Sequence, residues 1–309
     1  MARYLLHRLL GTLAVLWGMT VLVFLMIHAT PGDPARALLG DMGRGATEED
    51  VALIRAQLGL DRPLLAQYQD FLAKLLRGDL GKSWRSNRPV AEEIRERFPY
   101  TVQLAGTSLV IAVLFGIPAG VVAAARPYSR IDYALTVASL VGVSVPVFWL
   151  GLLLMMLFSL VLGWFPASGS GSWKHLVMPA VTIGAASTAF IARMTRAAVR
   201  EALAEDYVRT ARAKGLAEVW VVGKHALRNA AMPILTTVGL ELGSLMGGAV
   251  LTETVFAWPG LGRLTVQAIL ARDIQLLQGC VLFTAAVFSG VNLLVDIGYT
   301  WLNPKVRFG

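Results

Sequence analysis

Hydrophobic positions in this chain form long runs, and shorter stretches between the runs carry most of the charge. A run of about 19 residues is long enough to cross a hydrocarbon core of about 30 Å as a helix. We therefore expect an all-α polytopic membrane protein with a single transmembrane domain over residues 1–309 and six transmembrane helices. The predicted spans are Leu9–Ile27, Thr101–Ala125, Tyr133–Trp164, Leu176–Ile191, Ile234–Thr252 and Gln278–Leu302.

Two of these runs need a closer look. The first resembles a signal peptide in position, but Ala29-Thr30-Pro31 is a poor cleavage site and the run is long, so we interpret it as an uncleaved span. The third is longer than a bilayer requires and contains Pro146. Proline has no backbone N–H, so it interrupts the hydrogen bonds of a regular helix. We expect it to tilt or kink, or to include an interfacial piece near Trp164.

The distribution of Lys and Arg predicts the orientation. One set of short loops carries most of the basic residues, whereas the other set has only Lys174, Arg263 and Arg272. By the positive-inside rule the first set is cytoplasmic, and six crossings place both termini there. The segment from about 30 to 100 is also charged, but loops longer than about 60 residues cross largely regardless of charge.

This segment of about 30–100 should form a folded external loop. Turn-forming motifs separate two stretches of mixed apolar and charged residues that suit small surface helices, at Glu48–Leu58 and Leu64–Leu76. The turns predict a cap over the external side and not a flexible linker. These motifs are Pro31-Gly-Asp-Pro34, Gly59-Leu-Asp-Arg-Pro63 and Ser86-Asn-Arg-Pro89.

The cytoplasmic loop of about 193–231 contains a polar, helix-prone segment, residues 201–215. Acidic residues lie at its start, basic residues at its end, and Gly215 follows, as charge compensation of a helix dipole and a glycine cap require. Small residues surround Tyr207, so another protein could approach the backbone closely. The pattern favours a docking helix over a solvated basic loop held by anionic lipid.

Composition and motifs exclude several classes of function. The net charge of +8 comes from residues that flank apolar spans and not from a basic surface with aromatic residues, so nucleic acid is not expected as a partner. The four histidines are scattered, the one cysteine lies in an apolar run, and no catalytic triad or metal-spaced cluster is visible. We expect no enzyme activity, metal or cofactor in this chain.

Gly81-Lys82-Ser83 is a misleading motif. A phosphate-binding loop needs a glycine five residues before Gly81, and Leu76 stands there. Its predicted location is also external. ATP hydrolysis would therefore have to come from another chain.

Glu241 is the one carboxylate expected deep in the membrane. Such a group costs about 2.5 to 3.5 kcal/mol at the centre of a bilayer, so it should face protein or a water-filled path. Gly243 and Gly247 nearby allow close helix approach. A role in a substrate path and a structural hydrogen bond at a helix interface both remain open. Glu253 and Asp296 lie near span ends, where snorkelling or capping would suffice.

Several motifs together resemble the inner-membrane permease subunits of bacterial ATP-binding-cassette importers, specifically the peptide/nickel branch. The general coupling-loop pattern of such importers is matched here only at Ala211, Gly215 and Leu227, and the departures are similar to that branch's own variant. The motifs that carry the resemblance are Asp206-Tyr-Val-Arg-Thr-Ala-Arg-Ala-Lys-Gly-Leu216, His225-Ala-Leu-Arg-Asn229, Pro233, Pro31-Gly-Asp-Pro34, Leu58-Gly-Leu-Asp-Arg-Pro63, Gly78-Asp-Leu-Gly81, Phe256-Ala-Trp-Pro-Gly-Leu-Gly262 and Asn303-Pro304.

The resemblance implies a complex in the bacterial inner membrane. Its other members would be a homologous second permease, two cytoplasmic ATPases that bind ATP and Mg²⁺, and an external solute-binding protein. The chain would form half of a path for dipeptides or oligopeptides, with glutathione or a nickel chelate as alternatives. The residues implied in coupling to the ATPases are Glu205, Asp206, Tyr207, Arg209, Ala211, Lys214 and Gly215.

Two other classes of function remain as alternatives. A proton- or sodium-coupled secondary transporter would use Glu241 as its coupling carboxylate, but it leaves the pattern of the cytoplasmic loop unexplained. An assembly or signalling protein would use the loop only as a scaffold. Neighbouring genes for a second permease, paired ATPases and a binding lipoprotein would exclude both.

Overall fold

The computed structural model describes residues 2–29, 47–57 and 59–302, and every regular element within these ranges is a helix. Two motifs of the sequence analysis, Pro31-Gly-Asp-Pro34 and Asn303-Pro304, lie outside the described residues. The elements are α1 (Ala2–Ala29), α3 (Glu48–Gln57), α4 (Leu64–Leu76), α5 (Val90–Ala125), α6 (Arg130–Ser144), α7 (Val147–Leu154), the π-helix η1 (Met155–Val161), α8 (Trp173–Leu203), α9 (Asp206–Ala213), α10 (Glu218–Trp220), the π-helix η2 (Val221–Ala226), α11 (Leu227–Gly248), α12 (Val250–Val255), α13 (Leu261–Leu270) and α14 (Ile274–Leu302).

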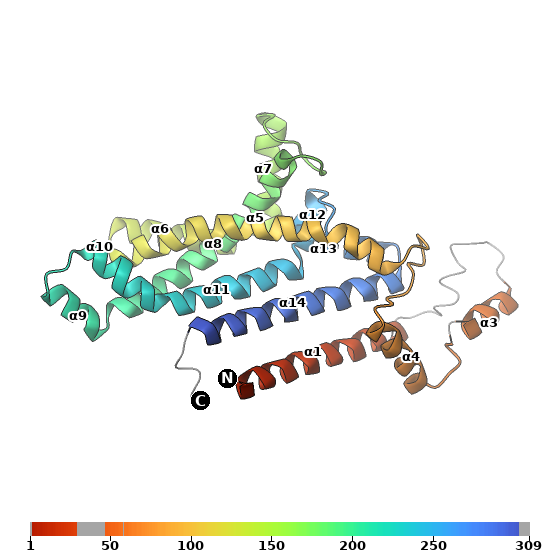
Figure 1. Ribbon diagram of the computed structural model, residues 1–309. Coiled ribbons are helices and arrows are strands. Elements are labelled where there is room, and N and C mark those ends of the chain that lie inside the picture. The colour runs from red at the N-terminus through yellow and green to blue at the C-terminus, as the bar shows by residue number, and fades with distance from the viewer. Residues whose placement is uncertain (1, 30–46, 58, 303–309) are drawn as a thin grey trace.

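The long helices lie side by side and form a bundle, with α3 and α4 at one end and α9 and α10 at the other (Figure 1). Five described helical segments are long and apolar enough to cross a membrane: Leu6–Met26, Val90–Ala125, Trp173–Leu203, Glu218–Gly247 and Ile274–Gly298. The bent pair formed by α6 with α7 and η1 makes a sixth if it is counted as one span. The predicted all-α membrane fold is confirmed.

The third predicted span is sharply bent. The axes of α6 and of α7–η1 differ by 98°, and Pro146 precedes the first residue of α7. Val145 is extended, with φ −76° and ψ 125°, as expected of a residue before proline. The kink at Pro146 is thus confirmed. Its size makes the α7–η1 segment project from the bundle (Figure 1), which the local sequence did not predict.

The centre of the bundle is the contact between α5 and α8. A Cβ atom at Gly120 would lie 2.5 Å from the carbonyl oxygen of Ala192, so only glycine permits this separation. Buried side chains continue the core toward both ends of the bundle. The clusters contain Leu104, Ala180, Ile183, Leu245 and Trp258 on the side of α12, and Ala198, Val199, Ala226, Ala230 and Ile234 on the side of α9.

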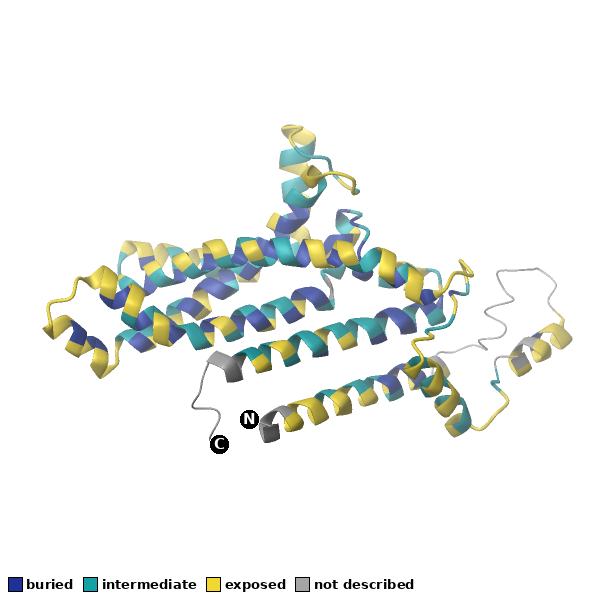
Figure 2. Ribbon diagram, in the orientation of Figure 1, coloured by how far each residue is buried: buried dark blue, intermediate teal, exposed yellow. Residues whose placement is uncertain are grey.

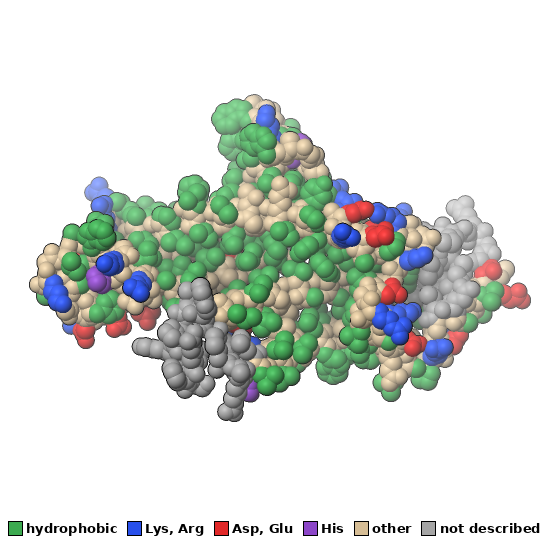
Figure 3. Space-filling model, in the orientation of Figure 1, with side chains coloured by type: hydrophobic (Ala, Val, Ile, Leu, Met, Phe, Trp, Pro, Cys, Tyr) green, Lys and Arg blue, Asp and Glu red, His purple; other side chains and the backbone are tan. Residues whose placement is uncertain are grey.

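Much of the apolar surface lies on the outside of the bundle. Exposed residues line α1 along its length (Figure 2), including Leu10, Leu13 and Trp17, each more than half exposed. The space-filling view shows hydrophobic side chains over the middle of the visible face and charged side chains at its two ends (Figure 3). A band of this kind fits a bilayer around the bundle.

In the segment predicted to form an external loop, both predicted helices are present, and α4 and the residues after it pack against the spans. Tyr68 of α4 contacts Thr20 of α1 through their hydroxyl groups at 2.8 Å, and its ring packs on Phe24. The loop that holds Gly81-Lys82-Ser83 is attached to the start of α14, because the Ser83 hydroxyl donates to Asp273 at 2.5 Å. Ser83 is buried, so this motif serves the fold of the loop.

Three helices extend beyond the predicted spans. α5 begins at Val90, so residues 90–100, predicted as the last part of the long loop, are helical and continuous with the second span. At the other end, α8 continues to Leu203 and the next long helical segment starts at Glu218. Residues 193–203 and 218–231 of the predicted polar loop are therefore helical, and residues 204–217 connect these helices through α9. Charged side chains on helix ends that extend past the apolar core explain these extensions.

An ion pair fastens α6 to α8. Arg196 donates to both carboxylate oxygens of Asp132, at 2.5 and 2.9 Å, and the Asp132 side chain is only 4% exposed. The backbone N–H of Tyr128 donates to the same carboxylate at 3.0 Å. These bonds fix the turn between α5 and α6 on the side of α8.

Asp132→Asn should destabilise the protein, because a neutral amide leaves the Arg196 charge without its partner. Breaking a buried pair of this kind costs about 3 kcal/mol or more. Unfolding of the purified protein in mixed micelles by added SDS measures the loss. Asp206→Asn, which breaks an exposed pair with Arg209, is the control and should leave the unfolding midpoint unchanged. Equal midpoints for the two variants would contradict a stabilising role of the Asp132 pair.

Candidate coupling and translocation sites

The predicted polar helix is present as α9, at the end of the bundle opposite α3 and α4 (Figure 1). Asp206 is its first residue, Glu205 precedes it, and Arg212 lies in its last turn. This order of charges compensates the helix dipole at both ends. α9 therefore forms for the reason that the sequence pattern suggests.

Gly215 ends α9 in a left-handed conformation, with φ +76°. Its N–H donates to the carbonyl of Arg212 at 2.9 Å, and the N–H of Leu216 donates to the carbonyl of Ala211 at 3.4 Å. These two bonds are those of a Schellman cap, which strongly favours glycine. The predicted glycine cap at Gly215 is confirmed.

Ala211 does not lie where we expected it. Its side chain is buried against Val208 and Val221, with Leu203 packed beside them, so it faces the chain's own helices. The expectation that its small size would admit another protein is wrong. Ala211 instead allows α9 to pack closely on the start of the α10–η2–α11 segment.

The outward surface of α9 is charged. Glu205, Asp206, Arg209 and Lys214 are exposed, and the only ion pair among them is the loose contact of 3.4 Å between Arg209 and Asp206. Such a surface is available to charged groups of another protein. Tyr207 lies at its edge, 37% exposed, with its hydroxyl donating to the carbonyl of Ala202 at 3.1 Å.

A second ion pair connects α9 to α10. Arg212 donates to both carboxylate oxygens of Glu218, at 3.1 and 2.6 Å. These hydrogen bonds, together with the charge of Glu218, raise the pKa of Arg212 above its usual value. The guanidinium is charged at any physiological pH, and the pair holds α9 in one direction relative to the next span.

Glu241 lies at the side of a cleft of about 280 Å³ between α7, α8, α11 and α12. The Ser187 hydroxyl of α8 donates to its Oε1 at 2.5 Å. Ser244 and several apolar side chains, Val147 and Ile183 among them, also line this cleft. The structure therefore places Glu241 both in a contact between helices and on an open space.

Gly243 and Gly247 face a different neighbour. A Cβ atom at Gly243 would lie 3.1 Å from Oδ1 of Asn292, and one at Gly247 would lie 3.8 Å from the ring of Phe288. Both partners belong to α14. These glycines thus lie in the contact between α11 and α14 within this chain, and they do not share the cleft with Glu241.

The sequence did not indicate that Glu253 is a buried residue that connects two helices. It is fully buried, so of the two expected explanations, snorkelling is wrong and capping is confirmed. One of its oxygens accepts from the Thr101 hydroxyl at 2.9 Å, and the other accepts from the N–H of Arg263 at 3.0 Å. Glu253 thereby caps α13 and joins it to α5. One signal in the sequence could have indicated this burial: the turn-forming stretch Phe256–Gly262 follows shortly after Glu253, so the chain can fold back over the carboxylate.

Asp296 forms an ion pair with Arg8 at 3.0 Å, which joins α14 to α1 near their ends on the side of α9. Its carboxylate is 16% exposed. A pair between two span ends explains this acid without a role in transport.

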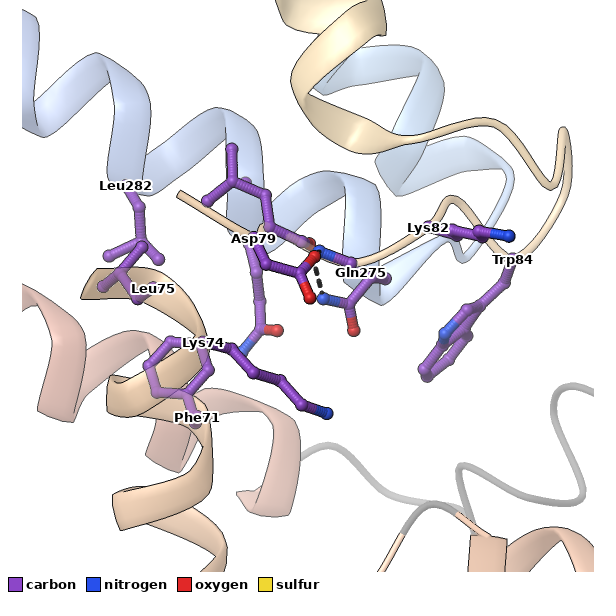
Figure 4. Close-up of a pocket in the computed structure, with 12 residues that line it drawn as sticks. Phe71, Lys74, Leu75, Asp79, Lys82, Trp84, Gln275 and Leu282 are labelled. Atoms are coloured by element: carbon purple, nitrogen blue, oxygen red, sulfur yellow. Dashed lines mark hydrogen bonds between the residues drawn. The ribbon is translucent and has the colours of Figure 1, made fainter. Parts of the chain in front are cut away.

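A further cleft, of about 330 Å³, opens at the end of the bundle opposite α9, between α4 and α14 (Figure 4). Lys74 lies on α4, Gln275 on α14, and Asp79, Lys82 and Trp84 on the segment after α4 (Figure 4). Gln275 donates to the carbonyl of Leu80 at 2.8 Å, which connects this segment to α14. The cleft is mixed in charge. Within the described residues, no group of three or more His, Cys, Asp or Glu side chains could hold a metal ion.

Comparisons with known proteins agree with this architecture. Residues 116–308 match the family described as binding-protein-dependent transport system inner membrane component, and residues 1–105 match the N-terminal region of such membrane components. The chain is 46% identical to the glutathione transport system permease protein GsiC of Escherichia coli strain K12, and 47% identical to that of Salmonella typhi. Each alignment spans 311 positions and covers all of both chains.

Solved structures show the same fold. Two inward-facing structures of the MetNI methionine ABC transporter align with a TM-score of 0.58 at 17% and 20% identity. Each alignment covers 68% of this chain and 96% of the matched chain. The chain belongs to the family of binding-protein-dependent transport system inner membrane components, and it is a multi-pass permease subunit of an ATP-binding-cassette importer of the peptide/nickel branch.

Proposed function

We propose that this permease moves a small peptide of the glutathione type into the cytoplasm. The observation that supports this substrate class most strongly is the identity of 46% to 47% with glutathione permeases over the whole length of both chains. A nickel chelate is a weaker candidate, because the described residues contain no cluster suited to a metal ion.

The permease would act in a complex. A homologous second permease would close the open side of the Glu241 cleft, an external solute-binding protein would deliver the peptide, and two cytoplasmic ATPases would bind ATP and Mg²⁺. ATP hydrolysis would then take place in those partner subunits and not in this chain. Affinity purification of a tagged permease from its native host should recover a second permease and the ATPases; recovery of the permease alone would contradict this assembly.

Coupling would pass through α9. Its exposed charges are suited to a groove on an ATPase, and its inner side packs on Val221 at the start of the segment that leads into α11. A push on α9 would therefore reach the helix that carries Glu241. Such coupling requires α9 to contact the ATPase differently in the two states of the transporter.

We infer that α9 and both termini lie in the cytoplasm. Single cysteines at Ser86 and Val219 test this in a background of Cys280→Ala, since both positions are exposed. An impermeant maleimide should label Ser86→Cys in spheroplasts and Val219→Cys in inverted inner-membrane vesicles. The opposite pattern would reverse the orientation.

The substrate class is tested on the solute-binding protein encoded with this permease. Titration calorimetry should show binding of glutathione or of a dipeptide, and no binding of a nickel chelate. Binding of the chelate alone would replace the peptide by a metal complex as the substrate.

A further inference from the structure

Glu241 presents its two carboxylate oxygens to different surroundings. Oε1 accepts the hydroxyl hydrogen of Ser187, whereas Oε2 has no hydrogen-bond donor among the described residues and is not sealed inside the protein. No described Lys, Arg or His forms an ion pair with this carboxylate. One half of the group is therefore held in place, and the other half is free to bind something in the cleft.

None of the described residues that line the cleft carries a positive charge. Its other lining residues are apolar or have a small hydroxyl side chain, with Leu245 and Leu251 on the side of α11 and α12. A carboxylate in apolar surroundings attracts a cation more strongly than it does in water, because the local dielectric constant is lower. A cationic group that carries hydrogen-bond donors would therefore complement Glu241.

We propose that the cleft binds the ammonium group of the transported peptide, with Glu241 as the ligand and Ser187 as the residue that positions it. This inference rests on the proposed function, because a peptide supplies the ammonium group and a second permease would close the open side. The volume of about 280 Å³ suits a small part of a peptide and not a folded protein. The ammonium would donate to Oε2 while Ser187 holds Oε1.

Three substitutions separate this role from a structural one. Glu241→Gln keeps an oxygen that can accept from Ser187 but removes the charge. Glu241→Asp keeps the charge but shortens the side chain, which weakens the contact with Ser187. A cation site therefore requires the Asp variant to work better than the Gln variant, whereas a structural hydrogen bond requires the reverse. Glu201→Gln makes the same change at an exposed glutamate outside the cleft and is the control.

The test uses the complete complex with its solute-binding protein in proteoliposomes, and it measures glutathione uptake together with ATP hydrolysis. We expect Glu241→Gln to lower uptake about tenfold, as the loss of one charge-assisted hydrogen bond would, while stimulated ATP hydrolysis stays within about twofold. Glu241→Asp should recover most of the uptake, and Glu201→Gln should match wild type.

Two results would overturn the cation site without refuting the proposed substrate. One is wild-type uptake by Glu241→Gln, and the other is better uptake by Glu241→Gln than by Glu241→Asp. Loss of uptake, ATP hydrolysis and permease pairing together in both Glu241 variants would also overturn it, since that pattern is a failure of assembly. Absence of glutathione uptake by the wild-type complex would instead refute the proposed substrate, and the inference with it.

Discussion

Replacing Gly215 with valine should abolish both peptide uptake and stimulated ATP hydrolysis, while the permease remains folded in the membrane. Gly215 has φ +76°, and a β-branched residue in this conformation costs about 1 to 2 kcal/mol. The valine would relax toward negative φ, and the two bonds of the Schellman cap would break. α9 would then point in another direction and lose its proposed contact with the ATPase.

Matched variants show whether the backbone is the cause. No atom lies within 4 Å of a Cβ built at Gly215, so a clash would not explain the loss. Gly215→Asn should retain much of the activity, because asparagine tolerates left-handed conformations. Gly223→Val, at another open glycine of this region but without positive φ, should transport normally. If Gly215→Val hydrolyses ATP and transports like wild type, α9 is only a connector.

The position and ends of α9 could be predicted from the sequence, because they depend on local chemistry. Asp206 at its start, Arg212 near its end and Gly215 after it each act on the helix that contains them. The burial of Ala211 could not be predicted, because it depends on Val221 and Leu203, which belong to other helices. A small residue in a polar helix can lie on either the buried or the exposed side of that helix. The packing of the neighbouring helices determines that Ala211 is buried.

The same distinction holds for the spans and for the carboxylates. Hydrophobic runs predicted the crossings and Pro146 predicted a kink, but the local sequence did not predict a bend as large as 98°. Proximity to a span end suggested solvent access for Glu253, yet the loop from Phe256 to Gly262 folds back over it. Thr101 is far from Glu253 in the sequence, and Arg263 follows the turn that comes after Glu253. Neither contact could therefore be predicted from the residues next to Glu253.

Glu253→Leu should destabilise the permease strongly and prevent normal assembly. The leucine would remove the acceptor of the Thr101 hydroxyl and of the Arg263 N–H in a fully buried place. Each lost hydrogen bond to a charged group costs about 1.5 to 3 kcal/mol, so we expect a loss of at least about 3 kcal/mol. Unfolding by SDS in mixed micelles and the yield of assembled complex measure the effect.

Glu253→Gln tests how much of this effect is due to charge. The amide keeps one acceptor oxygen, so its loss of stability should be smaller than that of the leucine variant. Glu201→Leu replaces an exposed glutamate near the end of α8 and should leave both readouts unchanged. Wild-type stability of Glu253→Leu would show that the cap on α13 contributes nothing to the fold.

The central claim is that ATP hydrolysis drives uptake through this permease, and a measurement of the energy source of uptake tests it most directly. Wild-type permease is reconstituted with its second permease and ATPases in proteoliposomes, with the solute-binding protein outside and ATP or a non-hydrolysable analogue inside the orientation-selected vesicles. We expect glutathione uptake only with hydrolysable ATP on the side of α9 and only with the solute-binding protein present. Uptake driven by a proton or sodium gradient without ATP would contradict this account and identify a secondary transporter.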